Sequence, residues 1–410
     1  MLLSIGMIVK NEEKYLDKCL SALRPVLEQV DSELIIADTG STDNSFEIAQ
    51  KYTEKVFSFK WTDDFSAARN STVERASGDW FMFLDADEIF ESCNDIISFF
   101  TSGESKKYNS ATFVIRNKYA DGGSSDFNAP RLTRLKPNTR FDGVIHETLL
   151  TFGGEIKDLK DIAIHYGYLI NDEAEKENKF NRNSVLLQKK LEKCGESDPL
   201  IFLQLYECYC LHDRKKAEEY LEHGIRVCEQ GENPVLIALY CHKAHLRYFD
   251  GKYKDCLSVC DKYFRMSRRI RPGIITTDCE MHGFRASSLY HTGQSDTAIS
   301  AYSSFFTLRS MIKNGKLKTA DADMLVYFIS ADENLCAALF EFLSACVSVS
   351  DTTSAINVMC DTVISDIGNN PTYISALVNT MQTLIGACGN EYEAGILTSS
   401  CNKLCAKLSE

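Results

Sequence analysis

Three acidic residues follow one of the most apolar short stretches in the first part of the chain. Asp85, Asp87 and Glu88 come directly after WFMFL (residues 80–84), within the segment DWFMFLDADEIF. Carboxylates crowded together repel each other and raise each other's pKa unless a cation lies near them. Mg²⁺ or Mn²⁺ prefers such oxygen ligands and keeps positions open for the phosphate oxygens of a substrate. Asp85 and Asp87 are therefore candidate metal ligands, although solvated acids in a polar turn would give the same tripeptide.

Alternating strand and helix patterns place these acids at the edge of a sheet. Residues 2–9, 33–38, 55–61 and 80–84 form apolar runs typical of buried strands. Helical patterns lie between them, one of which opens with Asn44 and Glu47 in the spacing of a capping box. Strands and helices in alternation predict a mainly parallel α/β sheet of Rossmann-like type, and ligands bind at the carboxyl ends of its strands.

The pattern loosens after this region, and its end marks a change of domain. Strand-like pieces occupy residues 111–117, 131–135, 143–150 and 162–168, and the Gly/Ser/Asp-rich segment 120–130 predicts a mobile loop. We therefore expect an α/β domain over residues 1–175 and an all-α domain over residues 176–410.

The second domain carries internal repeats. DGKYKDCLSVCDKYF aligns with HTGQSDTAISAYSSFF so that Gly251 matches Gly293 and Cys256 matches Ala298, and a weaker copy puts Ala217 at the same position. Small residues where two helices cross, followed by an aromatic residue, resemble the tetratricopeptide pattern. Beyond residue 320 only further helices are predicted.

Composition limits the class of protein. A chain of 410 residues with 44% hydrophobic residues can bury two cores. Its 16 cysteines are a small share of its length, and the start of the chain lacks the regions of a secretion signal, so reduced thiols and a cytoplasmic location are expected. The net charge of −13 disfavours nucleic-acid binding, and no apolar run approaches the length of about 20 residues that spans a membrane.

Four segments together resemble a known family. SIGMIVKNEEKYLDKCLSAL, ELIIADTGSTDNS, WTDDFSAARN and GDWFMFLDADE, in this order and spacing, are similar to the family-two inverting glycosyltransferases of the GT-A fold. The resemblance covers about residues 1–185 and points to a subgroup with tetratricopeptide-like helices after the catalytic domain. Within it, the arrangement looks like enzymes that glycosylate cysteine or serine of bacteriocin precursor peptides.

The resemblance implies roles for individual residues. Val9 and Asp38 would hold the nucleotide base, Arg69 would approach the nucleotide, and Asp85 and Asp87 would face the metal. The full set of implied nucleotide-sugar-binding residues is Val9, Asn11, Glu12, Asp38, Asp64, Arg69, Asp85, Ala86 and Arg131. Two simpler interpretations stay open, because Asp38 could cap the turn before Gly40 and Arg69 could pair with Asp63 or Asp64.

Later segments supply further candidates. FDGVIHETL and IAIHYGY contain His146 and His165, and the resemblance makes His165 a third metal ligand beside Asp85 and Asp87. An inverting mechanism needs a base on the face of the sugar opposite the leaving group. Glu147 is the candidate for this catalytic role, with Asp142 in reserve, and Arg131 would offset phosphate charge.

These observations predict a metal-dependent transferase that moves one sugar from a nucleotide donor to a peptide, protein or glycan acceptor. The donor that we expect is a uridine diphosphate sugar. The helical domain would select the acceptor or mediate a homodimer. One alternative is a non-catalytic helical-repeat adaptor with a degenerate nucleotide-sugar-binding domain. A second is a nucleotidyltransferase, but VKNEEKY lacks the glycines of a phosphate loop. A polysaccharide synthase would show a Gln-x-x-Arg-Trp motif, which the sequence lacks.

Overall fold

The computed structural model describes residues 1–119, 122–167, 169, 173–271, 277–314, 316, 332–362 and 367–409. Contacts divide the chain into two compact units, Met1–Gly195 and Glu196–Glu410. The predicted boundary after residue 175 falls within helix α5 (Glu173–Cys194), which belongs to the first unit. Each unit is therefore described by itself.

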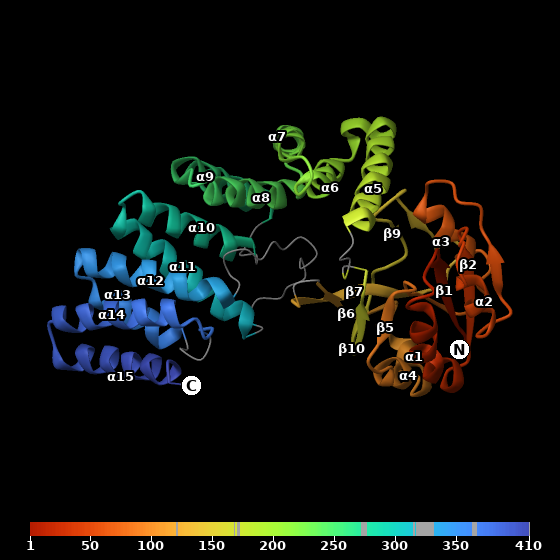
Figure 1. Cartoon of the computed structure of the whole chain (residues 1–410), viewed down its shortest axis with the longest axis horizontal. Coiled ribbons are helices and arrows are strands. Elements are labelled where there is room, and N and C mark those ends of the chain that lie inside the picture. The colour runs from red at the N-terminus through yellow and green to blue at the C-terminus, as the bar shows by residue number, and fades with distance from the viewer. Residues whose placement is uncertain are drawn as a thin grey trace. The chain divides into compact units, whose positions relative to one another are not determined.

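An eight-stranded mixed sheet forms the centre of the first unit, with strand order β3-β2-β1-β4-β7-β6-β10-β5 (Figure 1). The strands are β1 (Leu3–Val9), β2 (Ser32–Asp38), β3 (Val56–Ser58), β4 (Trp80–Phe83), β5 (Glu88–Phe90), β6 (Ser110–Lys118), β7 (Ser124–Arg134) and β10 (Ile156–His165). The first four strands in this order are parallel, as predicted, and β7 then joins β4 in the antiparallel sense. A separate pair consists of β8 (Phe141–Asp142) and β9 (Thr148–Leu149). The predicted α/β class is confirmed.

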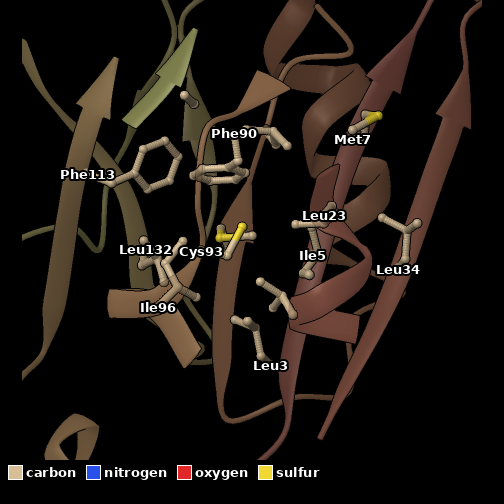
Figure 2. Packing of buried hydrophobic residues seen from close by; sticks show 14 of the residues in the cluster. Leu3, Ile5, Met7, Leu23, Leu34, Phe90, Cys93, Ile96, Phe113 and Leu132 are labelled. Carbon is tan, nitrogen blue, oxygen red and sulfur yellow. The ribbon is translucent and has the colours of Figure 1, made fainter. Parts of the chain in front are cut away.

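Helices cover both faces of the parallel part. They are α1 (Leu16–Gln29), α2 (Ser45–Gln50), α3 (Phe65–Val73) and α4 (Asn94–Thr101), with a short 3₁₀ helix at Glu104–Lys107. Figure 2 shows Leu3, Ile5 and Met7 of β1 on the same side as Leu23 of α1 and Ile96 of α4, where they form the main core. On the other face, α3 comes so close to β1 that a Cβ on Gly6 would lie 2.6 Å from Thr72 Oγ1. Gly6 therefore allows the close packing that fixes α3 above the sheet.

Several local predictions were wrong. The segment expected to be a mobile loop forms much of β7 from Ser124 onward, because seven of the nine residue pairs between β6 and β7 fall within it. Residues 120 and 121 lie outside the described residues. The strand expected over residues 143–150 shortens to Thr148–Leu149. Asn44 does precede α2, but its side chain donates to Glu13 Oε2 at 2.8 Å and forms no capping box.

The second unit is built from helices. They are α6 (Leu200–Tyr209), α7 (Arg214–Gly231), α8 (Val235–Phe249), α9 (Tyr253–Ile270), α10 (Thr277–His291), α11 (Ser295–Lys313), α12 (Asp332–Val349), α13 (Thr352–Asp361), α14 (Pro371–Ala387) and α15 (Glu391–Lys407) (Figure 1). Side chains of Asp213, Asp351, Asn370 and Asn390 cap four of these helices by accepting backbone N–H groups, which explains where the helices begin.

The predicted repeat register is confirmed. Gly251 and Gly293 occupy the equivalent turns before α9 and α11, both with positive φ. Ala217, Cys256 and Ala298 are all buried at the equivalent positions of α7, α9 and α11, as small residues at helix crossings should be. Among the helices that the structure describes, none combines the length and apolar character needed to cross a membrane.

Candidate active site

The ends of β1 and β2 form one side of the site. Val9 and Asp38 are register partners, and the chain turns immediately after both. Asp38 Oδ1 accepts the backbone N–H groups of Gly40 at 2.9 Å and Ser41 at 3.0 Å, so Asp38 does stabilise the turn. Its second oxygen, Oδ2, is buried without a hydrogen-bond partner, and the residue is 5% exposed. A buried acceptor that lacks a donor is destabilising, so Oδ2 is ready to accept an N–H group from a ligand.

The loop after β1 is fastened to the loop after β2. Asn11 has a left-handed backbone with φ of 56°, and its Oδ1 accepts the backbone N–H of Thr42 at 2.7 Å. The backbone N–H groups of Asn11 and Glu12 donate in turn to Ser41 Oγ at 3.0 Å and Ser45 Oγ at 2.7 Å. The side chain of Asn11 thus holds the two loops together at the edge where Val9 and Asp38 end.

Glu12 faces an acidic surrounding. Burial, together with the neighbouring Asp87, Asp85 and Asp43, raises the pKa of its carboxyl group to about 8. A carboxyl group in this position binds a proton near neutral pH unless a cation offsets the charge of its neighbours. The crowding of carboxylates predicted from DADE therefore extends to the first loop of the chain.

Arg69 of α3 lies at the centre of the site. Its Nη2 donates to Asp85 Oδ1 at 2.6 Å, and its Nε donates to Glu147 Oε1. The simpler interpretation, a pair with Asp63 or Asp64, is wrong. Asp63 pairs with Lys189 at 2.6 Å, and Asp64 Oδ1 accepts the Ala67 N–H at 2.9 Å as the N-cap of α3.

A second arginine holds Asp85 from the other side. Arg131 of β7 lies 3.6 Å from Asp85 Oδ2 and pairs with Glu88 Oε1. The guanidinium groups of Arg131 and Arg69 lie 4.4 Å and 4.9 Å from the centroid of the Phe83 ring. Burial would raise the pKa of Asp85, but the two arginines outweigh it and hold that pKa well below its usual range.

Glu88 is a site residue to which sequence reasoning gave no role. It is 1% exposed, its Oε2 accepts the backbone N–H of Asp85 at 3.0 Å, and its Oε1 pairs with Arg131. Burial and the nearby Asp85 raise the pKa of Glu88 although Arg131 opposes them. The feature of the sequence that could have indicated this residue is its position as the third acidic residue of DADE. Ala86, by contrast, packs its side chain into the hydrophobic core, so only its backbone is available to a bound nucleotide sugar.

Asp87 and His165 come together although they lie far apart in the sequence. His165 Nε2 at the end of β10 lies 3.4 Å from Asp87 Oδ2, and His165 Nδ1 is 2.8 Å from Asn117 Oδ1. Burial lowers the pKa of His165, but the contact with Asp87 outweighs it and raises that pKa. In the tautomer in which Nδ1 donates to Asn117 Oδ1, Nε2 keeps its lone pair and can ligate a metal beside Asp87, as metal-ligating histidines do.

The residues present fit a divalent metal only in part. Two ligands at about 2.1 Å from one ion can lie 3.4 Å apart, as Asp87 Oδ2 and His165 Nε2 do. Asp85 turns both oxygens toward arginines, and nowhere in the described part of the chain do three His, Cys, Asp or Glu side chains surround a common point. Mg²⁺ and Mn²⁺ fit such a partial site when phosphate oxygens and water complete the coordination. The three-ligand set of Asp85, Asp87 and His165 stays a prediction.

Glu147 is positioned by a loop that is tied to the start of α3. Phe65 N–H donates to Val144 O at 2.9 Å, and Ser66 Oγ donates to Gly143 O at 2.6 Å. His146 before Glu147 is held in a left-handed conformation with φ of 53°. Glu147 is therefore fixed beside Arg69, whereas the reserve candidate Asp142 is exposed on β8.

Comparison with known proteins identifies this arrangement. Residues 4–125 match the family model described as glycosyl transferase family 2. The chain contains a family 2 glycosyltransferase domain. The matched range includes Asp38, Arg69, Asp85 and Asp87 and ends before Arg131, so the domain's remaining site residues lie beyond the matched segment.

Two curated proteins and one solved structure are similar to parts of this chain. The TPR repeat-containing protein Synpcc7942_0270 of Synechococcus elongatus is 38% identical to this chain over 146 residues, which is 35% of this chain and 34% of that protein. The SPbeta prophage-derived glycosyltransferase SunS of Bacillus subtilis is 27% identical over 238 residues, 54% of this chain and 53% of that protein. A crystal structure of S. aureus TarS covers 67% of this chain and 56% of that chain at 15% identity with a TM-score of 0.34. The matches to the two curated relatives thus span between about a third and about half of their length.

Proposed function

We propose that the protein is a metal-dependent inverting glycosyltransferase that moves one sugar from a uridine diphosphate sugar to a peptide or protein side chain. The observation that carries the proposal is the contact of Asp87 with His165, beside an Asp85 held by two arginines, in a chain whose residues 4–125 match glycosyl transferase family 2. The match to the family supports sugar transfer. The donor, the metal and the acceptor are argued from the residues themselves.

The nucleotide base is assigned to the ends of β1 and β2. The unpaired Oδ2 of Asp38 would accept the ring N–H of uracil, and Val9 beside it would contact the base. Because the hydrogen bond between Asn11 and Thr42 already joins the loops after β1 and β2, the base would bind to a preformed surface. Preorganisation of this kind reduces the entropy that binding must overcome.

Asp87 and His165 would hold Mg²⁺ or Mn²⁺ together with the donor. When bound, the metal neutralises charge that develops on the departing diphosphate, which is the main electrostatic demand of the reaction. Asp85 stays ionised because Arg69 and Arg131 lie against it, and its backbone N–H is fixed by Glu88. This network would keep the carboxylate in one orientation at the ribose and metal.

Glu147 is proposed to accept the proton of the acceptor. Its carboxylate is held in an ion pair with Arg69, and a carboxylate is in general a weak base. A weak base suits an acceptor that ionises readily, and a thiol with a pKa of about 8.5 does so far better than a hydroxyl group. The general acidity of thiols therefore favours a cysteine side chain over serine as the proposed acceptor.

The decisive experiment measures release of uridine diphosphate from a panel of its sugars, with and without Mn²⁺, in the presence of cysteine-containing and serine-containing peptides. A glycosyltransferase of this kind releases the nucleotide only with metal and faster with an acceptor. A helical-repeat adaptor would show neither turnover nor metal-dependent nucleotide binding. Release that is equally fast in EDTA would contradict the role of the metal.

A further inference from the structure

Strand β7 has one edge that no other strand of the described chain covers along most of its length. β6 pairs with β7 along nearly its whole length, whereas β4 pairs with β7 only over residues 132–134. The edge that faces away from β6 between residues 124 and 130, which we call the free edge of β7, has no partner strand, and residues 124–128 are exposed. At about 3.4 Å per residue, the free edge is roughly 20 Å long.

Alternate backbone N–H groups of β7 point toward the free edge. At the end of the hairpin that β6 and β7 form, the N–H of Tyr119 donates to Gly123 O at 3.0 Å. Hydrogen-bonded and non-hydrogen-bonded pairs alternate from there, so Val114 and Asn128 form a non-hydrogen-bonded pair. The N–H groups that point away from β6 are those of Ser124, Asp126 and Asn128. Among the described residues no other segment accepts from them, so they can bind another extended chain.

The free edge runs past the candidate active site. Arg131 follows it at one end and lies 3.6 Å from Asp85 Oδ2. The register shifts here and leaves Arg131 without a partner in β6, and a bulge of this kind re-aims a side chain. Toward the other end, Ser125 is in register with Asn117 of β6, and Asn117 is in register with His165 of β10. The free edge therefore extends between the level of Asp85 and the level of His165.

A peptide matches the free edge better than a glycan does. Backbone N–H and C=O groups repeat along an extended peptide at the spacing of a strand, and proteins bind peptides by adding them to an exposed sheet edge. A glycan has no such repeat. Phe127 is 37% exposed and lies two residues from Ser125 on the same face, so it offers an apolar contact to a side chain of the added strand.

We propose that the acceptor binds as an extended peptide that adds a strand to the free edge of β7. This inference rests on the proposed function and names the part of the fold that recognises the acceptor. The side chain that receives the sugar lies toward the Arg131 end, because Arg131 contacts Asp85 there and Arg69 joins Asp85 to Glu147. Backbone hydrogen bonds supply the affinity, so an acceptor must be long enough to pair with the edge.

The test measures transfer to two probes, with Mn²⁺ and the uridine diphosphate sugar that the release assay selects. One probe is a library of peptides of about ten residues, randomised around one cysteine. The other is N-acetylcysteine amide, which is too short to pair with the free edge. We expect the wild type to have a higher kcat/KM for the library than for the short probe.

Asn128→Pro removes one N–H from the free edge without removing a hydrogen bond to β6, and the matched control Asn128→Ala keeps that N–H. We expect Asn128→Pro to lower kcat/KM for the library about tenfold relative to Asn128→Ala, with transfer to the short probe unchanged. Methylation of the backbone nitrogens of the peptides should lower transfer by the wild type in the same way. This second measurement decides the matter if the proline variant misfolds and also loses transfer to the short probe.

The outcomes separate this inference from the proposed function. If the wild type glycosylates the library no better than the short probe, or if backbone methylation leaves transfer to the peptides unchanged, the assignment to β7 is wrong and the proposed function stands. If light scattering shows that Asn128→Pro converts a dimer into a monomer, the free edge binds a second copy of the chain and the inference is again overturned. If the wild type glycosylates neither probe, the proposed function fails and the inference with it.

Discussion

The two units differ in how they use charged side chains. In the first unit the ion pairs of the site join distant segments, since Arg69 and Glu147 are 78 residues apart and Arg131 and Glu88 are 43 apart. In the second unit, pairs such as Arg214 with Glu218 and Lys243 with Glu222 join the same helix or neighbouring helices. The ion pairs of the first unit fix the charged side chains of the site in one place. Those of the second unit lie on the surfaces of helices and join each helix to itself or to its neighbour. Changes in the first unit should therefore alter binding, and changes in the second should alter stability.

Asp87→Ala should have the largest effect on function. It removes the carboxylate that faces His165 without creating a cavity in the core, so the fold should remain. We expect turnover to fall at least about 10²–10³-fold and the effect of Mn²⁺ on donor binding to disappear. Steady-state kinetics and circular dichroism check the two parts. Normal turnover would show that the metal lies elsewhere.

Phe305→Ala should lower the stability of the second unit and leave nucleotide binding unchanged. Phe305 on α11 is fully buried, and loss of its ring leaves a cavity between helices. The free energy of unfolding should fall by about 3–5 kcal/mol for the transition that involves this unit. Affinity for uridine diphosphate, measured at a temperature where the protein is folded, should not change. Loss of that affinity would contradict the separation of roles between the units.

Gly167→Ala tests the candidate metal site by adding a single methyl group. At this position the new Cβ would lie 2.5 Å from Asp87 Oδ2 and His165 Nε2, so the two side chains must separate. We expect Mn²⁺ affinity in the presence of uridine diphosphate to fall about 10–100-fold. The control is Gly395→Ala on α15, where no atom lies within 4 Å, and it should leave metal affinity unchanged. Equal metal affinity in both variants would argue against the assigned ligand pair.

A smaller, pH-dependent effect is expected in the second unit. Burial lowers the pKa of His245 and of His282 to about 4, so both stay neutral in the folded state while the unfolded chain binds protons near pH 6.5. Their contribution to stability is complete above pH 6.5 and is lost as the pH falls from there toward 4. Thermal unfolding across this range should show the loss, and His245→Gln should make it smaller. An unchanged profile would show that His245 is not buried in its neutral form.

Sequence periodicity predicted most of the fold because the pattern of a helix or a buried strand is local. The repeat register of Cys256 and Ala298 and the strands that end at Val9 and Asp38 follow from such patterns. The segment from Ser124 onward was misjudged because its polar composition is typical of loops. Its pairing with β6, which only the folded chain reveals, makes it a strand.

Only those residues of the candidate site that belong to a recognisable sequence motif could be predicted. DADE pointed to Asp85 and Asp87, and the family resemblance pointed to His165 and Arg69. The partners of Arg69 depend on contacts between segments far apart in the chain, so the sequence left a pair with Asp63 or Asp64 open.

The central claim is that Asp87 and His165 hold a divalent cation together with a nucleoside diphosphate. Electron paramagnetic resonance of Mn²⁺ measures free and bound metal directly, in the presence and absence of uridine diphosphate. The account predicts that uridine diphosphate increases Mn²⁺ binding in the wild type and in the His146→Ala control, and that His165→Ala abolishes this increase. Equal Mn²⁺ binding by His165→Ala and the wild type, with uridine diphosphate present, would contradict it.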